Sequence, residues 1–203
     1  TIEEVLSSPP ISDPLRLLDM CPRTDGACAV VYASEEVAEK ICPQPAWVVA
    51  TANRHCYSRF SDVMGQTGML SLTVAAKELW RKTGIREPLK EIDVVELYQP
   101  YSWAGLIWIE DLGFCKKGEG GAFVSEQRLR FDSPLKPALN TDGGGLSSNH
   151  PGMRGIFLLI EATRQLRGES TSQVPGARLA VAHGNGGMLA TSHTGGTIVL
   201  AGD

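Results

Sequence analysis

Asn140-Thr-Asp-Gly-Gly-Gly-Leu-Ser-Ser-Asn-His-Pro-Gly-Met-Arg-Gly155 combines glycines, one histidine and the expected start of a helix. Glycines 143–145 permit backbone angles that other residues avoid, so main-chain amides there could approach a ligand closely. Asn149 is a helix-capping residue type and Pro151 is favoured at the first helical position, which predicts a helix over residues 151–167. Free N–H groups at its start would favour negative charge beside His150. A second interpretation explains the pattern equally well. In it the stretch is only a glycine-rich loop before a buried helix, and His150 has no role beyond hydrogen bonds within the protein.

Composition limits the class of protein. The 203 residues, 42% hydrophobic and 21% charged, suit one large domain or one domain with an appendage. A net charge of −4 without a basic stripe argues against nucleic-acid binding. The apolar runs are too short to cross a bilayer and no signal peptide opens the chain, so a cytoplasmic protein without a membrane span is expected. Five cysteines without CxxC spacing predict free thiols and no metal site.

The hydrophobic pattern alternates strands with helices, which predicts an α/β fold. Strands are expected over residues 25–34, 47–51, 92–97, 178–182 and 197–201, and helices over 72–80 and 102–112. Residues 1–22 have little apolar content and are interpreted as a connecting segment. Asn185-Gly186 is a strong turn signal, so residues 183–187 are predicted to form the tip of a hairpin.

Tyr98 follows the predicted strand 92–97 directly. Pro100 disfavours a helical conformation at Gln99, so Tyr98 should lie where the strand ends. Side chains at the carboxyl ends of strands are where α/β folds place their sites. Tyr98 is therefore a candidate site residue.

The glycine-rich stretch resembles the Gly-His-Pro block of the thiolase superfamily, particularly thiolases of the sterol carrier protein x and lipid-transfer type. Asn149 stands where that block usually has glycine. Asp-Gly-Ala-Cys-Ala at residues 25–29 and Tyr-Gln-Pro-Tyr-Ser at 98–102 resemble other segments of the same subgroup. The resemblance implies a thiolase-like C-terminal half, with a mixed five-stranded sheet covered by helices on both faces. Residues 1–45 would be the end of the N-terminal half and a connector, and residues 46–203 the C-terminal domain.

The resemblance also implies roles for single residues. His150 would be the catalytic base, and Tyr98 occupies a position that is usually Asn or His. The last cysteine block falls on residues 183–187, where His183 is the nearest substitute and His193 the alternative. Residues expected to bind the oxyanion or the substrate are Gly144, Asn149, Gly186 and Gly187. Arg154, Lys116 and Lys117 could contact phosphate, although solvated surface charge is the more ordinary role for such residues.

Three functions fit this resemblance. The first is thiolase-type acyl transfer, meaning 3-ketoacyl-CoA thiolysis or the reverse condensation. Coenzyme A is then a co-substrate, no cofactor is bound, and the nucleophilic cysteine comes from an N-terminal half absent from this sequence. This chain alone would then be inactive, being either part of a longer protein or one of two chains.

The second function is retro-aldol cleavage of a 3-hydroxyacyl-CoA with a steroid or aromatic side chain, often in complex with a small zinc-ribbon/OB-fold acyl-CoA-associated protein. The third is a non-catalytic acyl-CoA or lipid carrier, or a partner subunit. A homodimer or tetramer is expected for the family.

Overall fold

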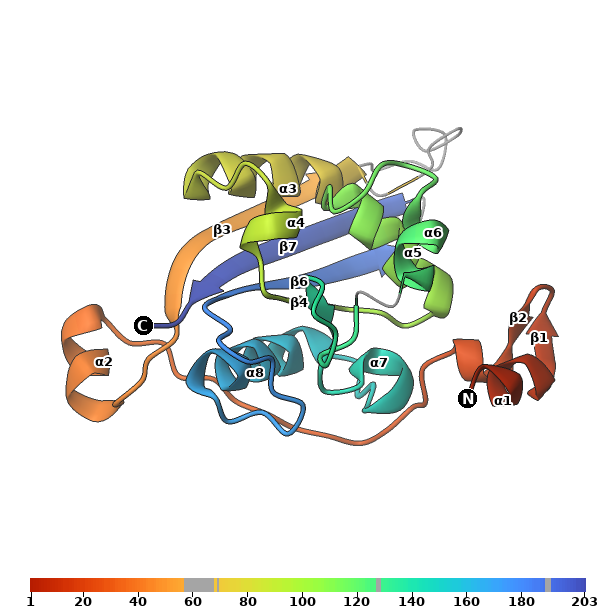
Figure 1. Ribbon diagram of the computed structural model, residues 1–203, viewed down its shortest axis with the longest axis horizontal. Helices are drawn as coiled ribbons and strands as arrows, with labels where there is room; N and C mark the ends of the chain where they lie inside the picture. The colour runs from red at the N-terminus through yellow and green to blue at the C-terminus, as the bar shows by residue number, and fades with distance from the viewer. Residues whose placement is uncertain (57–67, 69, 127–128, 189–190) are drawn as a thin grey trace.

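A mixed sheet forms the centre of the computed structural model, which describes residues 1–56, 68, 70–126, 129–188 and 191–203. Its five strands lie in the order β3-β7-β6-β4-β5 (Figure 1). They are β3 (Trp47–Cys56), β4 (Val94–Leu97), β5 (Ala138–Leu139), β6 (Leu179–Met188) and β7 (Thr191–Ala201). β7 is antiparallel to both β3 and β6, while β4 is parallel to both β5 and β6. The predicted mixed five-stranded sheet is confirmed.

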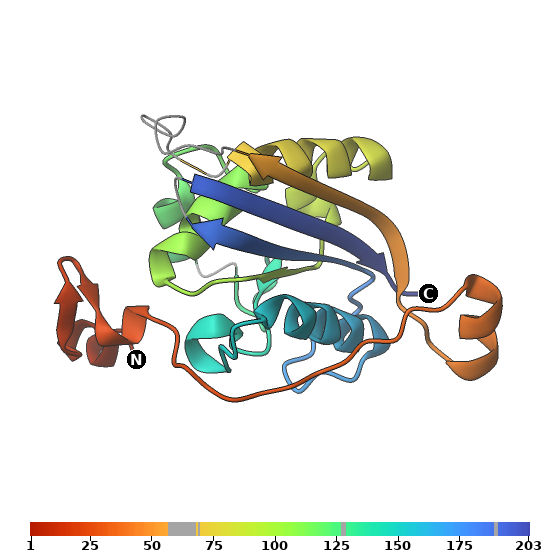
Figure 2. The same cartoon turned by 180° about the vertical axis from the view of Figure 1, so that it is seen from behind.

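Helices cover both faces of this sheet, as predicted (Figures 1 and 2). On one face lie α3 (Leu70–Thr83), α4 (Pro88–Glu91), α5 (Ser102–Asp111) and α6 (Gly120–Ser125), and on the other α7 (Gly144–Ser147) and α8 (Arg154–Arg167). Alternation along β6 divides the core in two: Val181 packs into the cluster under α3 and α5, whereas Ala180 and Ala182 pack with α8.

Helix α3 confirms a prediction from local periodicity. Leu72, Ala75, Ala76 and Leu79 follow helical spacing and are all buried against the sheet. The helix ends before Gly84, whose φ of +74° suits glycine and stops a helix.

The first 46 residues depart from the expected pattern. Instead of a plain connector, residues 1–22 form α1 (Ile2–Ser7) with a capping box at Thr1, the short strands β1 (Pro10–Ser12) and β2 (Leu15–Arg16), and a 3-10 helix, η1 (Leu17–Asp19). Residues 20–34, called the strap below, then pass under α7 and α8 and lead to α2 (Glu35–Ile41) (Figure 1). The strand predicted over residues 25–34 is not formed, because no described strand pairs with this strap. The predicted boundary at residue 45 stays a prediction.

The C-terminal hairpin is longer than predicted. Residues 183–187 do not turn but continue β6, so the hairpin tip predicted there was wrong. Gly184 pairs with Gly196 and Asn185 with Gly195, so the antiparallel ladder overrides the local Asn-Gly turn preference. The side chain of His193, the alternative to His183, lies outside the described part of the structure.

Candidate active site

Tyr98 lies directly after β4, and the turn that carries it is held by Asn140. The Asn140 side chain accepts a hydrogen bond from the Leu97 N–H at 2.7 Å and donates one to Gln99 Oε1 at 3.0 Å. Asn140 has a φ of +48°, a left-handed conformation that asparagine tolerates better than most residues. The Tyr98 N–H donates to the carbonyl of His183 on the neighbouring β6 at 2.9 Å. Tyr98 is thus fixed at the end of a strand, as predicted.

The structure brings His150 onto Tyr98. His150 Nε2 lies 2.7 Å from the Tyr98 hydroxyl, and the two ring centroids are 5.2 Å apart. Both side chains are half-buried. The His150 main-chain N–H donates to Thr24 Oγ1 at 3.1 Å, so the N-terminal strap also holds this loop. A phenol and an imidazole at this distance form a pair through which a proton can pass.

His150 does not lie at the start of a helix, so that prediction was wrong. Helix α8 begins at Arg154, after a Met153 cap whose side chain makes no capping bond. Gly152 has a φ of +86°, which breaks the helical path between Pro151 and Arg154. Helix α8 therefore begins four residues after His150, and Asn149 is not its cap.

The glycine run serves close packing. The Gly144 N–H donates to Asp142 Oδ1 at 2.8 Å, so this amide is occupied within the protein. A methyl group at Gly145 would lie 2.5 Å from the Gln99 carbonyl oxygen, which only glycine avoids. The glycines thus allow this loop to pack against the turn that carries Tyr98.

His183 lies near Tyr98 but in the core. Its side chain is fully buried, its Nδ1 is 2.8 Å from Thr197 Oγ1, and burial lowers its pKa to about 3. The Trp108 ring centroid is 6.5 Å from that of His183 and 6.3 Å from that of Tyr98. Among described contacts, His183 makes no side-chain bond to the Tyr98–His150 pair. Gly186 is exposed, and with Gly187 it extends β6 toward its end.

Cys21 was missed by sequence reasoning. Its N–H donates to the Pro100 carbonyl at 2.9 Å, which joins the strap to the turn after Tyr98. Burial raises the pKa of Tyr98, and the neighbouring Cys21 and Tyr101 raise it further. Burial also raises the pKa of Cys21. Both the phenol and the thiol are therefore held in their protonated forms at neutral pH. Only the fold brings residue 21 to residue 98, so no local signal could reveal this contact.

Of the three charged residues considered as phosphate contacts, Arg154 and Lys117 pair with carboxylates of the protein, whereas Lys116 is exposed. Arg154 is neither a phosphate contact nor a solvated charge: its side chain is fully buried and donates to both Asp142 carboxylate oxygens, at 2.5 and 2.6 Å. Lys117 pairs with Asp111 at 2.5 Å.

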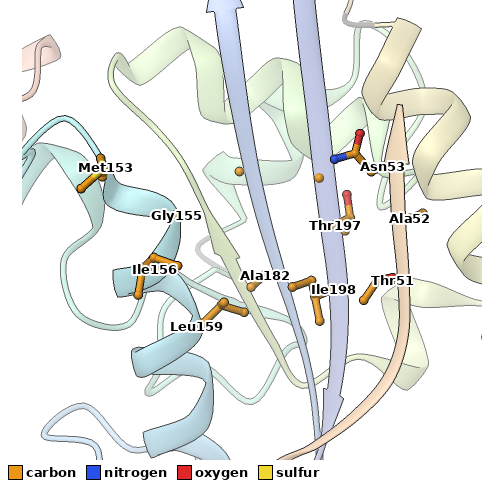
Figure 3. Close-up of a pocket in the computed structure, with 12 residues that line it drawn as sticks. Thr51, Ala52, Asn53, Met153, Gly155, Ile156, Leu159, Ala182, Thr197 and Ile198 are labelled. Carbon is orange, nitrogen blue, oxygen red and sulfur yellow. The ribbon is translucent and has the colours of Figure 1, made fainter. Parts of the chain in front are cut away.

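An apolar cleft of about 530 Å³ lies between α8 and the face of β3, β6 and β7 (Figure 3). It is lined by side chains that include Ile156, Leu159, Ala182 and Ile198, while Met153 lies at its edge beside the loop that carries His150. Neither Tyr98 nor His150 lines this cleft.

Two further features bear on the kind of site. Over the described ranges, no three His, Cys, Asp or Glu side chains gather closely enough to bind a metal ion. No described helix has the length and apolar character needed to span a membrane.

Comparisons with known proteins agree with this fold. The family model for thiolase C-terminal domain-like proteins matches residues 52–200. The chain is 35% identical over 202 residues to acetyl-CoA acetyltransferase of Methanothermobacter thermautotrophicus, covering 98% of this chain and 50% of that protein. It is 33% identical over 181 residues to 17-hydroxy-3-oxo-4-pregnene-20-carboxyl-CoA lyase of Mycobacterium tuberculosis, covering 87% and 45%.

A solved structure shares the fold. The Ltp2-ChsH2(DUF35) aldolase matches with a TM-score of 0.80 at 24% identity, covering 100% of this chain and 51% of that chain. The chain thus spans about half the length of its relatives. The chain belongs to the thiolase superfamily and contains the C-terminal domain of that family.

Proposed function

We propose that the protein containing this chain acts on acyl-CoA thioesters, and that the Tyr98–His150 pair cleaves a carbon–carbon bond in them by a retro-aldol reaction. The substrate would be a 3-hydroxyacyl-CoA with a bulky steroid or aromatic side chain. The observation that carries the proposal is the 2.7 Å contact between the Tyr98 hydroxyl and His150 Nε2 at the carboxyl end of β4.

The chemistry needs a base for the 3-hydroxyl group and a donor for the enolate that results. In the proposed step the substrate hydroxyl gives its proton to the Tyr98 oxygen while the Tyr98 proton moves to His150 Nε2. The bond between C2 and C3 breaks, and its electron pair forms the thioester enolate. C3 leaves as an aldehyde or ketone, and the enolate then takes a proton at C2. No CoA is consumed.

Two observations favour this chemistry over thiolysis. Thiolysis needs a thiolate nucleophile and, in the resemblance, a second thiol near residues 183–187, where His183 is the nearest candidate and is buried in the core. The raised pKa of Tyr98 keeps a proton on the phenol, which suits a proton relay. A comparison also supports the proposal: a relative 33% identical to this chain is named 17-hydroxy-3-oxo-4-pregnene-20-carboxyl-CoA lyase.

Thiolase-type acyl transfer is the second candidate. The 35% identity to an acetyl-CoA acetyltransferase over 98% of this chain favours it. CoA would then be a co-substrate, and a cysteine outside this sequence would form the acyl-enzyme. In either case we propose a cytoplasmic enzyme that is a homodimer or tetramer, or a complex with a small zinc-ribbon/OB-fold acyl-CoA-associated protein. In a non-catalytic carrier, the Tyr98–His150 pair would have no role.

Product analysis separates the three functions. The natural gene product, purified with any subunit that accompanies it, is incubated with a 3-hydroxyacyl-CoA and, separately, with a 3-ketoacyl-CoA plus free CoA. The proposal predicts release of a ketone or aldehyde from the first substrate without loss of free thiol. CoA-dependent cleavage of the second substrate alone would establish acyl transfer instead. Binding without any product would establish a carrier.

A further inference from the structure

A fully buried guanidinium lies beside the proposed catalytic loop. Arg154 is 1% exposed. It donates to both oxygens of Asp142, to the Asn149 carbonyl at 3.3 Å and to the Asn149 side-chain oxygen at 2.5 Å. Burying a guanidinium is costly unless it is paired and hydrogen-bonded, so a purely structural position would more readily be apolar.

These bonds join the two segments that carry the catalytic pair. Asn149 immediately precedes His150, and Arg154 is the first residue of α8. Asp142 lies two residues after Asn140, which holds the turn of Tyr98 through the Leu97 N–H and Gln99. These hydrogen bonds, together with the two-residue step of the chain from Asn140 to Asp142, therefore connect the Tyr98 turn to the His150 loop.

We propose that Arg154 and Asn149 are positioning residues that hold the His150 ring against the Tyr98 hydroxyl; the inference rests on the proposed function. The helix does not fix this loop, because Gly152 interrupts the helical path and α8 starts only at Arg154; the bond from the His150 N–H to Thr24 holds the main chain but not the ring. Arg154 fits this task because its planar guanidinium carries two terminal nitrogens: Nη2 donates to both Asp142 oxygens, while Nη1 reaches Asn149. Asn149 supplies a side-chain acceptor that the glycine usual at this position in similar blocks would lack.

Two variants test the positioning directly. Asn149→Ala removes one acceptor and leaves the Arg154–Asp142 pair intact, and Arg154→Lys keeps the charge but loses the fork. The readout in the folded chain is the NMR cross-relaxation between the ring protons of Tyr98 and His150, whose centroids are 5.2 Å apart. A control, Ala162→Gly in the buried face of α8, weakens the helix without touching these bonds.

Both positioning variants should lose at least about two thirds of this ring-to-ring signal, because loss of a geometric restraint lets the loop sample other positions. Ala162→Gly should keep the ring-to-ring signal, although its thermal midpoint is lowered to a value similar to that of the positioning variants. In the natural gene product, kcat should fall about tenfold with KM changed less than about twofold. Wild-type ring contact in both variants would overturn the proposal. If wild-type protein shows no aldol cleavage, the NMR result still decides the positioning separately from the function.

Discussion

His150 and His183 both contact Tyr98 but in opposite ways. His150 offers its ring nitrogen to the Tyr98 hydroxyl from a half-buried loop, whereas His183 offers only its backbone carbonyl to the Tyr98 N–H. The His183 ring points into the core, where burial lowers its pKa to about 3. Burial keeps this ring neutral and makes it a weak base at neutral pH. The environment of a histidine, more than its place in a motif, therefore decides its role.

The largest expected effect comes from removing the hydroxyl that His150 contacts. Tyr98→Phe keeps the ring and its packing near Trp108 but removes the proton relay, so kcat for aldol cleavage should fall about 10²- to 10⁴-fold. The thermal midpoint should change little, because the deleted hydroxyl is at a half-buried site. Steady-state kinetics and a thermal melt of the same preparation check this. A kcat within about threefold of wild type would remove Tyr98 from the mechanism.

His183 should instead control stability as a function of pH. Its pKa is lowered in the folded state from the ordinary 6.5 to about 3, so only the unfolded state binds a proton between these values. Stability is therefore complete above about pH 6.5 and falls as the pH is lowered, by up to about 1.4 kcal/mol per pH unit from this group.

The His183→Gln variant should show a shallower decline in stability between pH 7 and pH 4. Urea unfolding at several pH values measures it. An unchanged slope would mean that His183 is protonated in the folded protein.

A smaller effect of opposite sign is expected at Glu96, two residues before Tyr98. Thr141 Oγ1 lies 2.9 Å from Glu96 Oε1 and 2.6 Å from Glu161 Oε1, and one hydroxyl proton cannot serve both carboxylates. Burial raises the pKa of Glu96 well above its usual range, so Glu96 carries the extra proton. The contribution of Glu96 to folding stability is therefore complete below the ordinary carboxyl pKa. It is lost as the pH rises toward the raised pKa of Glu96 in the folded state.

Glu96→Gln imitates the protonated acid at every pH. The variant should therefore gain about 3 °C in thermal midpoint at pH 8 and gain nothing at pH 4. Scanning calorimetry at the two pH values measures this difference. The difference in thermal midpoint between Glu96→Gln and wild type is compared at the two pH values. If the variant is less favoured at pH 8 than at pH 4, Glu96 is ionised in the folded protein.

Elements that depend on local interactions could be predicted from the sequence, whereas those that depend on interactions between distant residues could not. The α3 helix and the β4 strand depend on local periodicity, and both were predicted. The turn at Asn185 failed because a long ladder with β7 outweighs two residues of turn preference. The helix start at Pro151 failed because Gly152 takes a positive φ.

The site shows the same division. Tyr98 and His150 were each singled out from strand position and family resemblance, but their contact joins residues 52 positions apart and needed the fold. The pairing of Arg154 with Asp142 has no pattern in the sequence, because an arginine at a helix start is ordinarily solvated.

The most direct measurement compares the two histidines in one experiment. His150→Gln and His183→Gln are made in the natural gene product, and kcat for cleavage of a 3-hydroxyacyl-CoA is measured at pH 7.5 on equal amounts of folded protein. We expect a loss of at least about 100-fold for His150→Gln and less than about tenfold for His183→Gln. A larger loss for His183→Gln than for His150→Gln would contradict the assignment of the Tyr98–His150 pair as the reacting centre.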